Sequence, residues 1–155
     1  MTPEQLLQRI ERLERQVNDM QLASQISYDS EQALRTRLDT PEYGIFTPTA
    51  TLVTNLDSGS ASEAQYLRVG NMVIVSGVIT INPTATGVTR LGLSLPLSSG
   101  LIATGDCAGT LCADTVASES GVIFADTTNA RAQATWNATN TAAHDMHYIY
   151  MYRLI

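Results

Sequence analysis

The sequence has no lysine, only two cysteines and no long apolar run, and each shortage excludes a class of protein. All nine basic residues are arginine and the formal net charge is −6, so the clustered positive charge that nucleic-acid binding needs is missing. Two cysteines, Cys107 and Cys112, are too few for a disulfide scaffold. No apolar run approaches the roughly 20 residues that cross a bilayer, and residues 1–16 lack the apolar core of a signal peptide. We therefore expect a soluble, unprocessed chain with no nucleic-acid partner and no membrane insertion.

Charge of either sign is scarce, and it is spread unevenly along the 155 residues. Charged residues make up 15% of the chain, against about 25% in a typical soluble protein. Residues 1–40 hold twelve of the twenty-four charged residues, five arginines and seven acidic residues. Hydrophobic residues reach 44%, which is enough for a buried core. The pattern predicts a charged N-terminal segment followed by one charge-poor domain.

The charged segment, residues 1–38, has the pattern of an α-helical coiled coil. Thr2 suits the N-cap, Pro3 the first helical position, and Gln5 the position that closes a capping box. Apolar residues then follow at alternating spacings of four and three, as the a and d positions of a heptad repeat do. These residues are Leu6, Ile10, Leu13, Val17 and Met20.

The pattern weakens after Met20 and then returns. The next heptad positions are polar, so either the apolar stripe drifts through Leu22 and Ile26 or the helix breaks near residues 28–30. Leu34 and Leu38 restore the spacing. We call the five residues named above, together with Leu34 and Leu38, the heptad seam, and we expect it to be the oligomerisation surface.

Two partners for the heptad seam have to be weighed against each other. An apolar stripe can pack on the body of its own chain, or it can pair with the same stripe in other copies. This seam is only two positions wide in seven, narrower than the stripe of a helix docked on a sheet, and so it favours a parallel oligomer. β-branched residues at a with leucine at d nominally favour dimers, but the rest of the chain can override so short a repeat.

The remainder of the chain is predicted to be a short linker and a β-rich domain. Residues 39–48 carry Pro41, Gly44 and Pro48 and are interpreted as the linker. Short runs of β-forming residues separated by turn residues then fill residues 49–155. The predicted strands are residues 49–55, 64–69, 72–81, 92–97, 120–125, 130–136 and 147–154, with one or two more within 101–112.

The spacing of these strands and turns indicates the fold class. Residues 57–60 are predicted to be a turn, and Gly70-Asn71 suits a two-residue hairpin turn. Tyr148, Tyr150 and Tyr152 would share one face of the last strand. Many short strands with no helical pattern between them are typical of a sandwich or jelly roll. The fold class predicted is therefore mainly β, an antiparallel β-sandwich or jelly-roll-like head after an N-terminal α-helical coiled coil.

The histidines and cysteines do not form a recognisable metal site. His144 and His147 would point to opposite faces of a strand, so only symmetry copies around a threefold axis could bring equivalent rings to one ion. Cys107 and Cys112 have no second pair, and zinc is not expected. We interpret the cysteines as two buried small apolar residues, with a disulfide between them as the alternative.

The acidic residues and arginines of the body also lack a catalytic pattern. Four acidic residues fall in predicted loops and are interpreted as solvated: Asp106, Asp114, Glu119 and Asp126. No spacing brings two of them together as a general acid and base, and motifs for nucleophilic, phosphate-binding or zinc-protease chemistry are absent. Arg68 and Arg131 either pair with a carboxylate across a subunit interface or lie exposed on their strands. We expect no enzymatic activity, no cofactor and no metal.

Four stretches of the body, taken in order, resemble the head domain that recurs in virion proteins of tailed bacteriophages. They are Phe-Thr-Pro-Thr at 46–49, the pattern Y-x-R-V-G-N-x-V-x-V-S-G at 66–77, Leu-Gly-Leu-Ser-Leu-Pro at 91–96 and D-x-x-N-x-R-A at 126–132. The resemblance covers residues 44–155. Such domains occur in fibres, spikes, needles and head-decoration proteins. The resemblance implies an obligate homotrimer, in which a short parallel coiled coil leads into three β-heads.

Together these observations predict a non-enzymatic structural protein of the phage virion, a head-decoration protein or short fibre appendage. Residues 1–38 would be the stem and anchor, and residues 49–155 the head. The expected partners are two more copies of the chain, other proteins of the capsid or tail, and a glycan on the host cell surface. The alternative is a receptor- or glycan-binding tip of a tail fibre, whose contacts would be Trp136, Asn137 and Asn140.

Overall fold

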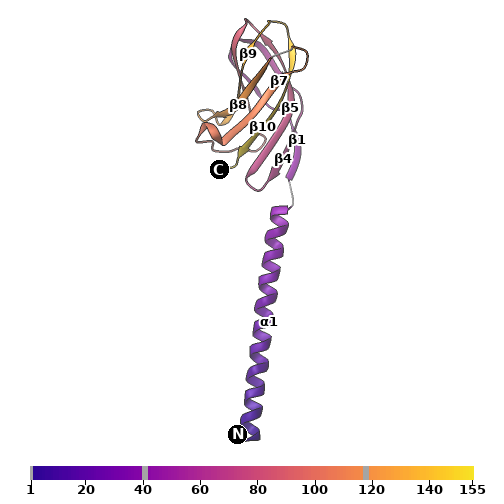
Figure 1. Ribbon diagram of the computed structural model, residues 1–155, viewed down its shortest axis with the longest axis vertical. Coiled ribbons are helices and arrows are strands. Elements are labelled where there is room, and N and C mark those ends of the chain that lie inside the picture. Colours follow the sequence, from indigo (N-terminus) through magenta and orange to yellow (C-terminus); the bar gives the residue numbers. More distant parts are fainter. Residues whose placement is uncertain (1, 40–41, 117–118) are drawn as a thin grey trace. The chain divides into compact units, whose positions relative to one another are not determined.

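The computed structural model describes residues 2–39, 42–116 and 119–155 (Figure 1). The chain divides into two compact units, Met1–Thr40 and Pro41–Ile155, and each is described on its own. We call the second the β-rich unit. The chain is mainly β with one N-terminal helix, which confirms the coarse fold class predicted from the sequence.

The first unit contains a single uninterrupted helix, α1 (Pro3–Asp39). The predicted capping box is present at its start: Gln5 donates its backbone N–H to the Thr2 hydroxyl over 3.3 Å, and the Gln5 side chain accepts from the Thr2 N–H over 3.0 Å. The break considered near residues 28–30 is absent. There Ser30 donates its hydroxyl to the Ile26 carbonyl at 2.8 Å, a bond to the preceding turn that a helix tolerates.

The β-rich unit contains ten strands in one curled antiparallel sheet. Its strands are β1 (Glu42–Phe46), β2 (Ala50–Thr54), β3 (Leu56–Ala61), β4 (Ala64–Val69), β5 (Met72–Pro83), β6 (Gly87–Leu93), β7 (Cys107–Ala113), β8 (Ser120–Asp126), β9 (Arg131–Ala138) and β10 (His144–Arg153). A short 3-10 turn, η1 (Thr104–Asp106), precedes β7. The order across the sheet is β1-β4-β5-β10-β7-β8-β9-β6-β2, and β3 also pairs with β5. Strands far apart in sequence are therefore neighbours, above all β5 and β10.

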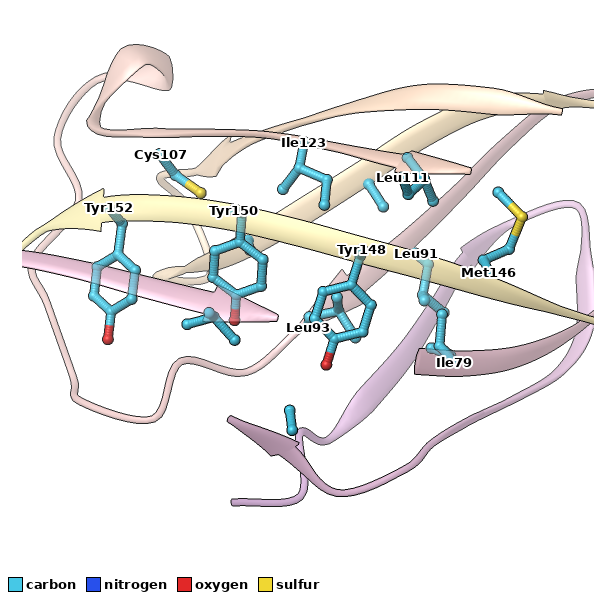
Figure 2. Packing of buried hydrophobic residues seen from close by; sticks show 14 of the residues in the cluster. Ile79, Leu91, Leu93, Cys107, Leu111, Ile123, Met146, Tyr148, Tyr150 and Tyr152 are labelled. Atoms are coloured by element: carbon cyan, nitrogen blue, oxygen red, sulfur yellow. The ribbon is translucent and has the colours of Figure 1, made fainter. Parts of the chain in front are cut away.

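The core lies on the inner side of the curled sheet. Alternation along β10 places Tyr148, Tyr150 and Tyr152 on one face, as predicted, and this face is buried, with ring centroids 5.9 and 6.3 Å apart (Figure 2). Tyr152 donates its hydroxyl to the Leu97 carbonyl at 2.7 Å, and burial raises the pKa of this phenol to about 12. Leucine and isoleucine side chains from β5 to β8 belong to the same cluster, each contributing about 1.5–3 kcal/mol on burial.

The prediction of a linker at residues 39–48 is wrong for most of that range. The helix continues to Asp39, and strand β1 occupies Glu42–Phe46. Gly44, interpreted as a linker residue, lies against the Tyr66 ring, and a Cβ at this position would come within 2.7 Å of the ring unless the ring shifted. That ring also packs edge-on against Phe46 at a centroid distance of 6.1 Å.

Two other local predictions are corrected by the sheet. Residues 57–60 are not a turn but part of β3, and the chain turns instead at Asn55, whose φ is 58°. The strand predicted at 92–97 lies earlier, because β6 ends at Leu93. Just beyond this strand end, Ser94 donates its backbone N–H to the Thr49 carbonyl at 3.1 Å.

Candidate functional site

The described part of the heptad seam is solvent-exposed along its whole length. Its five side chains, Leu6, Ile10, Leu13, Val17 and Met20, are between 44% and 64% exposed. Ile10, Leu13 and Val17 outline a shallow hollow with Glu14 and Asn18, the kind of surface that receives a side chain from a facing helix. Leu34 and Leu38 lie within α1, but their side chains are outside the part of the chain whose side chains the structure describes. The seam therefore offers a narrow apolar surface for association.

Trp136, the proposed sugar-stacking residue, is buried instead. It lies on the inner face of β9, the face that Ala134 and Ala138 share, and is 3% exposed. A buried ring cannot stack on a glycan, so the contact predicted for Trp136 is wrong. Asn137 points outward and is exposed, whereas Asn140 accepts the Ala142 N–H at 2.9 Å within its own turn.

The most buried polar cluster in the described residues is one that the sequence did not reveal. Glu119, interpreted as a solvated loop residue, is only 2% exposed. One carboxylate oxygen lies 2.8 Å from Nε2 of His144, and the other accepts both the backbone N–H and the hydroxyl of Thr139. Nδ1 of His144 lies 2.8 Å from the Ala142 carbonyl, which can only accept, so this nitrogen carries a proton.

This cluster ties together two connections of the sheet. Glu119 also accepts the Ala113 N–H at its backbone carbonyl over 2.9 Å, so it bonds to β7 as well as to Thr139 and His144. Burial by itself raises the pKa of Glu119, but the hydrogen bonds from Thr139 and His144 more than offset it, and the pKa is lowered. The arrangement is that of a structural clamp between the segments before β8 and before β10.

The other candidate charges are paired within their own chain. Arg131 Nε donates to Asp126 over 2.8 Å, and Asn129 donates to the same carboxylate. Arg68 pairs with Glu42 over 3.2 Å at the β1–β4 edge. Both arginines therefore have carboxylate partners within their own chain.

The cysteines and His147 lie apart from the buried cluster. Cys107 is buried as expected, Cys112 is exposed contrary to expectation, and both are free thiols. Five positions apart on one strand, the two side chains point to opposite faces and cannot be bridged. His147 is exposed on β10, opposite Cys112 in the register. Among the described residues no three histidine, cysteine or acidic side chains group as metal ligands.

Comparison with protein-family models, curated proteins and solved structures gives no match for this chain. Within the part of the chain that the structure describes, no helix has the length and apolar character needed to cross a membrane. Among the sites described above, the heptad seam is the one whose apolar side chains remain exposed to solvent. It is the basis for the functional proposal below.

Three carboxylates of the β-rich unit have lowered pKa values, and this sets the expected pH dependence. Backbone N–H groups of Ala103 and Ile102 lower the pKa of Asp106, and Arg153 adds to the effect. Burial opposes ionisation of Asp126, but hydrogen bonds from Asn129 and Arg131 outweigh it. Glu119 behaves in the same way, as described above.

The stability of the β-rich unit is expected to fall in acid. A carboxyl group whose folded pKa is below its unfolded value, about 4 for Asp and Glu, stabilises the fold above that value and loses the contribution as the pH falls through the folded pKa. The urea midpoint, followed by fluorescence of the buried Trp136, should therefore be constant near neutrality and drop below about pH 4. Asp126→Asn should reduce the size of the drop. An equal drop in the variant would show that Asp126 does not contribute.

Proposed function

We propose that this chain is a non-enzymatic structural protein of a tailed-bacteriophage virion, assembled as a homotrimer through α1. The observation that carries the proposal is the exposed heptad seam: five apolar side chains at a and d positions, each 44–64% exposed. Leu7, Leu22, Ile26 and Tyr28 are also exposed on this helix, but the seam residues are the ones that keep the regular heptad spacing. A helix of 37 residues gains most of its stability by packing its apolar side chains, and the seam supplies a continuous stripe for that packing. Other copies of the same stripe are its natural partner.

The β-rich unit supports the virion part of the proposal through the motifs that resemble phage head domains. The pattern at 66–77 forms the β4–β5 hairpin, with Gly70 at a φ of 59° in its turn. The pattern at 126–132 forms the β8–β9 turn, in which Asp126 holds both Asn129 and Arg131. Gly70 and Asp126 therefore each shape a turn of the sheet. This structural role supports treating the two patterns as a signature of the head domain.

The proposal also includes a sandwich-like arrangement within each head. One cluster of buried residues draws members from β5, β6, β7, β8, β9 and β10, so the two sides of the curled sheet share a single core. Leu91 and Leu93 of β6 belong to this cluster together with the tyrosines of β10 (Figure 2). The head would thus be a rigid knob, suited to repeated display on a surface.

In this proposal the stem attaches the protein to the capsid or tail as a decoration or short fibre, and its site of action is the virion. Many such knobs would act by multivalency, in which weak contacts add through high effective concentration. The alternative of a glycan-binding tip has lost its aromatic contact with the burial of Trp136.

The assignment to the virion is tested by labelling intact particles of the phage that encodes the chain. Gold-conjugated antibodies against the chain are expected to decorate purified particles at repeated positions. Particles made with a chain lacking residues 1–40 should lose the label if the helix is the anchor. Label retained by the shortened chain would place the anchor in the β-rich unit, and particles without any label would overturn the virion assignment.

A further inference from the structure

The outer side of the sheet carries apolar side chains as well as the inner side. Residues opposite each other in an antiparallel ladder point to the same face. Leu67 on β4 lies opposite Tyr43 on β1 and Ile74 on β5, and Ile74 lies opposite Met151 on β10. One row of apolar side chains therefore crosses four adjacent strands on the face away from the core.

A second row runs beside the first and extends it. Ile149, two residues before Met151, lies opposite Thr110 on β7, which lies opposite Val122 on β8. Met72 shares the face of Ile74, two residues along β5. We call the following six residues the outer apolar face: Tyr43, Leu67, Met72, Val122, Ile149 and Met151.

The outer apolar face departs from the usual pattern of an antiparallel sheet, in which buried apolar residues alternate with exposed polar residues. The opposite side of the same strands is the core, where Val73, Val75 and Tyr150 are 0–1% exposed. A sheet with one solvated face normally places polar residues there. Here the six side chains are 36–81% exposed, with Tyr43 the most exposed. A connected apolar patch larger than a few hundred Å² marks an interaction surface on a soluble domain.

The charges around the face favour a contact between like chains. On the outer side of β4, β5, β8 and β10, the charged residues are Asp145 and Arg153, at opposite ends of β10, and Asp126 at the end of β8, which pairs with Arg131. Asp145 accepts the Thr80 hydroxyl at 2.6 Å and Arg153 pairs with Asp106 at 3.1 Å, so both have partners in their own chain. Two copies that each carry a net charge of −6 repel, and a face whose carboxylates are already paired within the chain lets them meet without opposing unpaired carboxylates.

We infer that the outer apolar face packs against the same unit of a second copy of this chain. The inference rests on the proposed helical association, because that association would hold the copies together at high local concentration. It is also supported by the sequence, in which only residues 40 and 41 separate α1 from β1, the strand that carries Tyr43. In a threefold ring the contact is heterologous, with the β1 side of one face meeting the β8 side of the next. The exposed Tyr43 ring suits the centre of such an interface.

The methionines of the chain allow a test in the intact protein. Peroxide converts exposed methionine to the sulfoxide, and mass spectrometry of peptides gives the rate at each site. Met72 and Met151 lie on the outer apolar face and are 46% and 45% exposed in one chain, Met20 lies on the heptad seam, and Met146 is fully buried. In purified full-length chain we expect Met72 and Met151 to oxidise more than tenfold slower than in urea. Without a contact, their exposure predicts rates within about threefold of the unfolded rate.

The variant Ile149→Glu separates this contact from other causes of protection. A carboxylate on the outer apolar face opposes burial of that face against a second copy, so Met72 and Met151 should oxidise near the unfolded rate. Met146 should stay protected and Trp136 fluorescence should stay native, because the fold itself is unchanged. Val88→Glu, at a position on β6 that is 53% exposed against 46% for Ile149, is the matched control and should leave both methionines protected. Protection that persists in Ile149→Glu would overturn the inference.

The rate at Met20 distinguishes failure of the inference from failure of the proposed function. Slow Met20 with fast Met72 and Met151 would leave helical association standing and overturn the face contact. Fast Met20 with slow Met72 and Met151 would support the face contact and contradict association through the helix. Fast rates at all three sites would overturn both. Protection of Met72 and Met151 only on whole virus particles would assign the face to a different virion protein.

Discussion

Replacing Glu119 with alanine is expected to lower the free energy of unfolding of the β-rich unit by about 3–5 kcal/mol. The Glu119 and His144 side chains are 0% and 3% exposed, and their contact distance is 2.8 Å. Removing the carboxylate leaves His144 Nε2 buried without its partner and takes away the acceptor of both Thr139 donors. A buried donor without an acceptor costs its desolvation free energy, which is larger than the net value of the bond it once made.

Urea unfolding of the full chain at fixed concentration, followed by Trp136 fluorescence, measures this loss. Glu63→Ala is the matched control, because Glu63 is exposed between β3 and β4 and its loss should change stability by less than about 0.5 kcal/mol. A double-mutant cycle with His144→Ala should give a coupling above about 1 kcal/mol, since the two side chains share one buried network. Equal effects of Glu119→Ala and Glu63→Ala would refute the clamp.

Sequence patterns predicted the elements whose signals are local. The capping box at Thr2 and Gln5 formed as expected, and α1 extends one residue beyond the predicted stem. The β4–β5 hairpin was located because Gly70-Asn71 separates two clear β runs. β1 and β3 were missed because their glycines, Gly44 and Gly59, were taken as breakers. In the fold these positions are instead crowded by the Tyr66 ring and by the Leu52 and Leu91 side chains.

The buried clamp could not be predicted from the sequence, and the reason is topological. Glu119 and His144 are 25 residues apart and carry no motif. They meet because β10 is inserted beside β7 while β8 pairs with β7, an order that strand patterns do not specify. The only signal in the sequence was the low number of ionisable residues in the β-rich unit, which makes a glutamate next to a predicted strand uncommon. The heptad seam, by contrast, is a periodic feature and was read directly from spacing.

The double substitution Leu13→Asp and Val17→Asp is expected to convert the assembled chain to a monomer. In the proposed trimer these positions contribute six buried side chains, each worth about 1.5–3 kcal/mol, so on the order of 10 kcal/mol of association free energy is lost. Six carboxylates would also face one another around the axis. At about 1.4 kcal/mol per tenfold change in affinity, no trimer should survive at micromolar concentration.

Light scattering gives the masses that decide this prediction. The unaltered chain should have three times its mass of 16.7 kDa, and the seam variant a single chain mass. Arg15→Asp changes the charge of α1 by the same two units on the side away from the seam and should leave the trimer intact. Helix content by circular dichroism should fall in the seam variant only, because an isolated helix loses the packing that stabilises it. A trimer that persists in the seam variant would exclude the heptad seam as the interface. An unaltered chain with twice the single-chain mass would keep the seam but replace the trimer with the dimer that β-branched a positions favour.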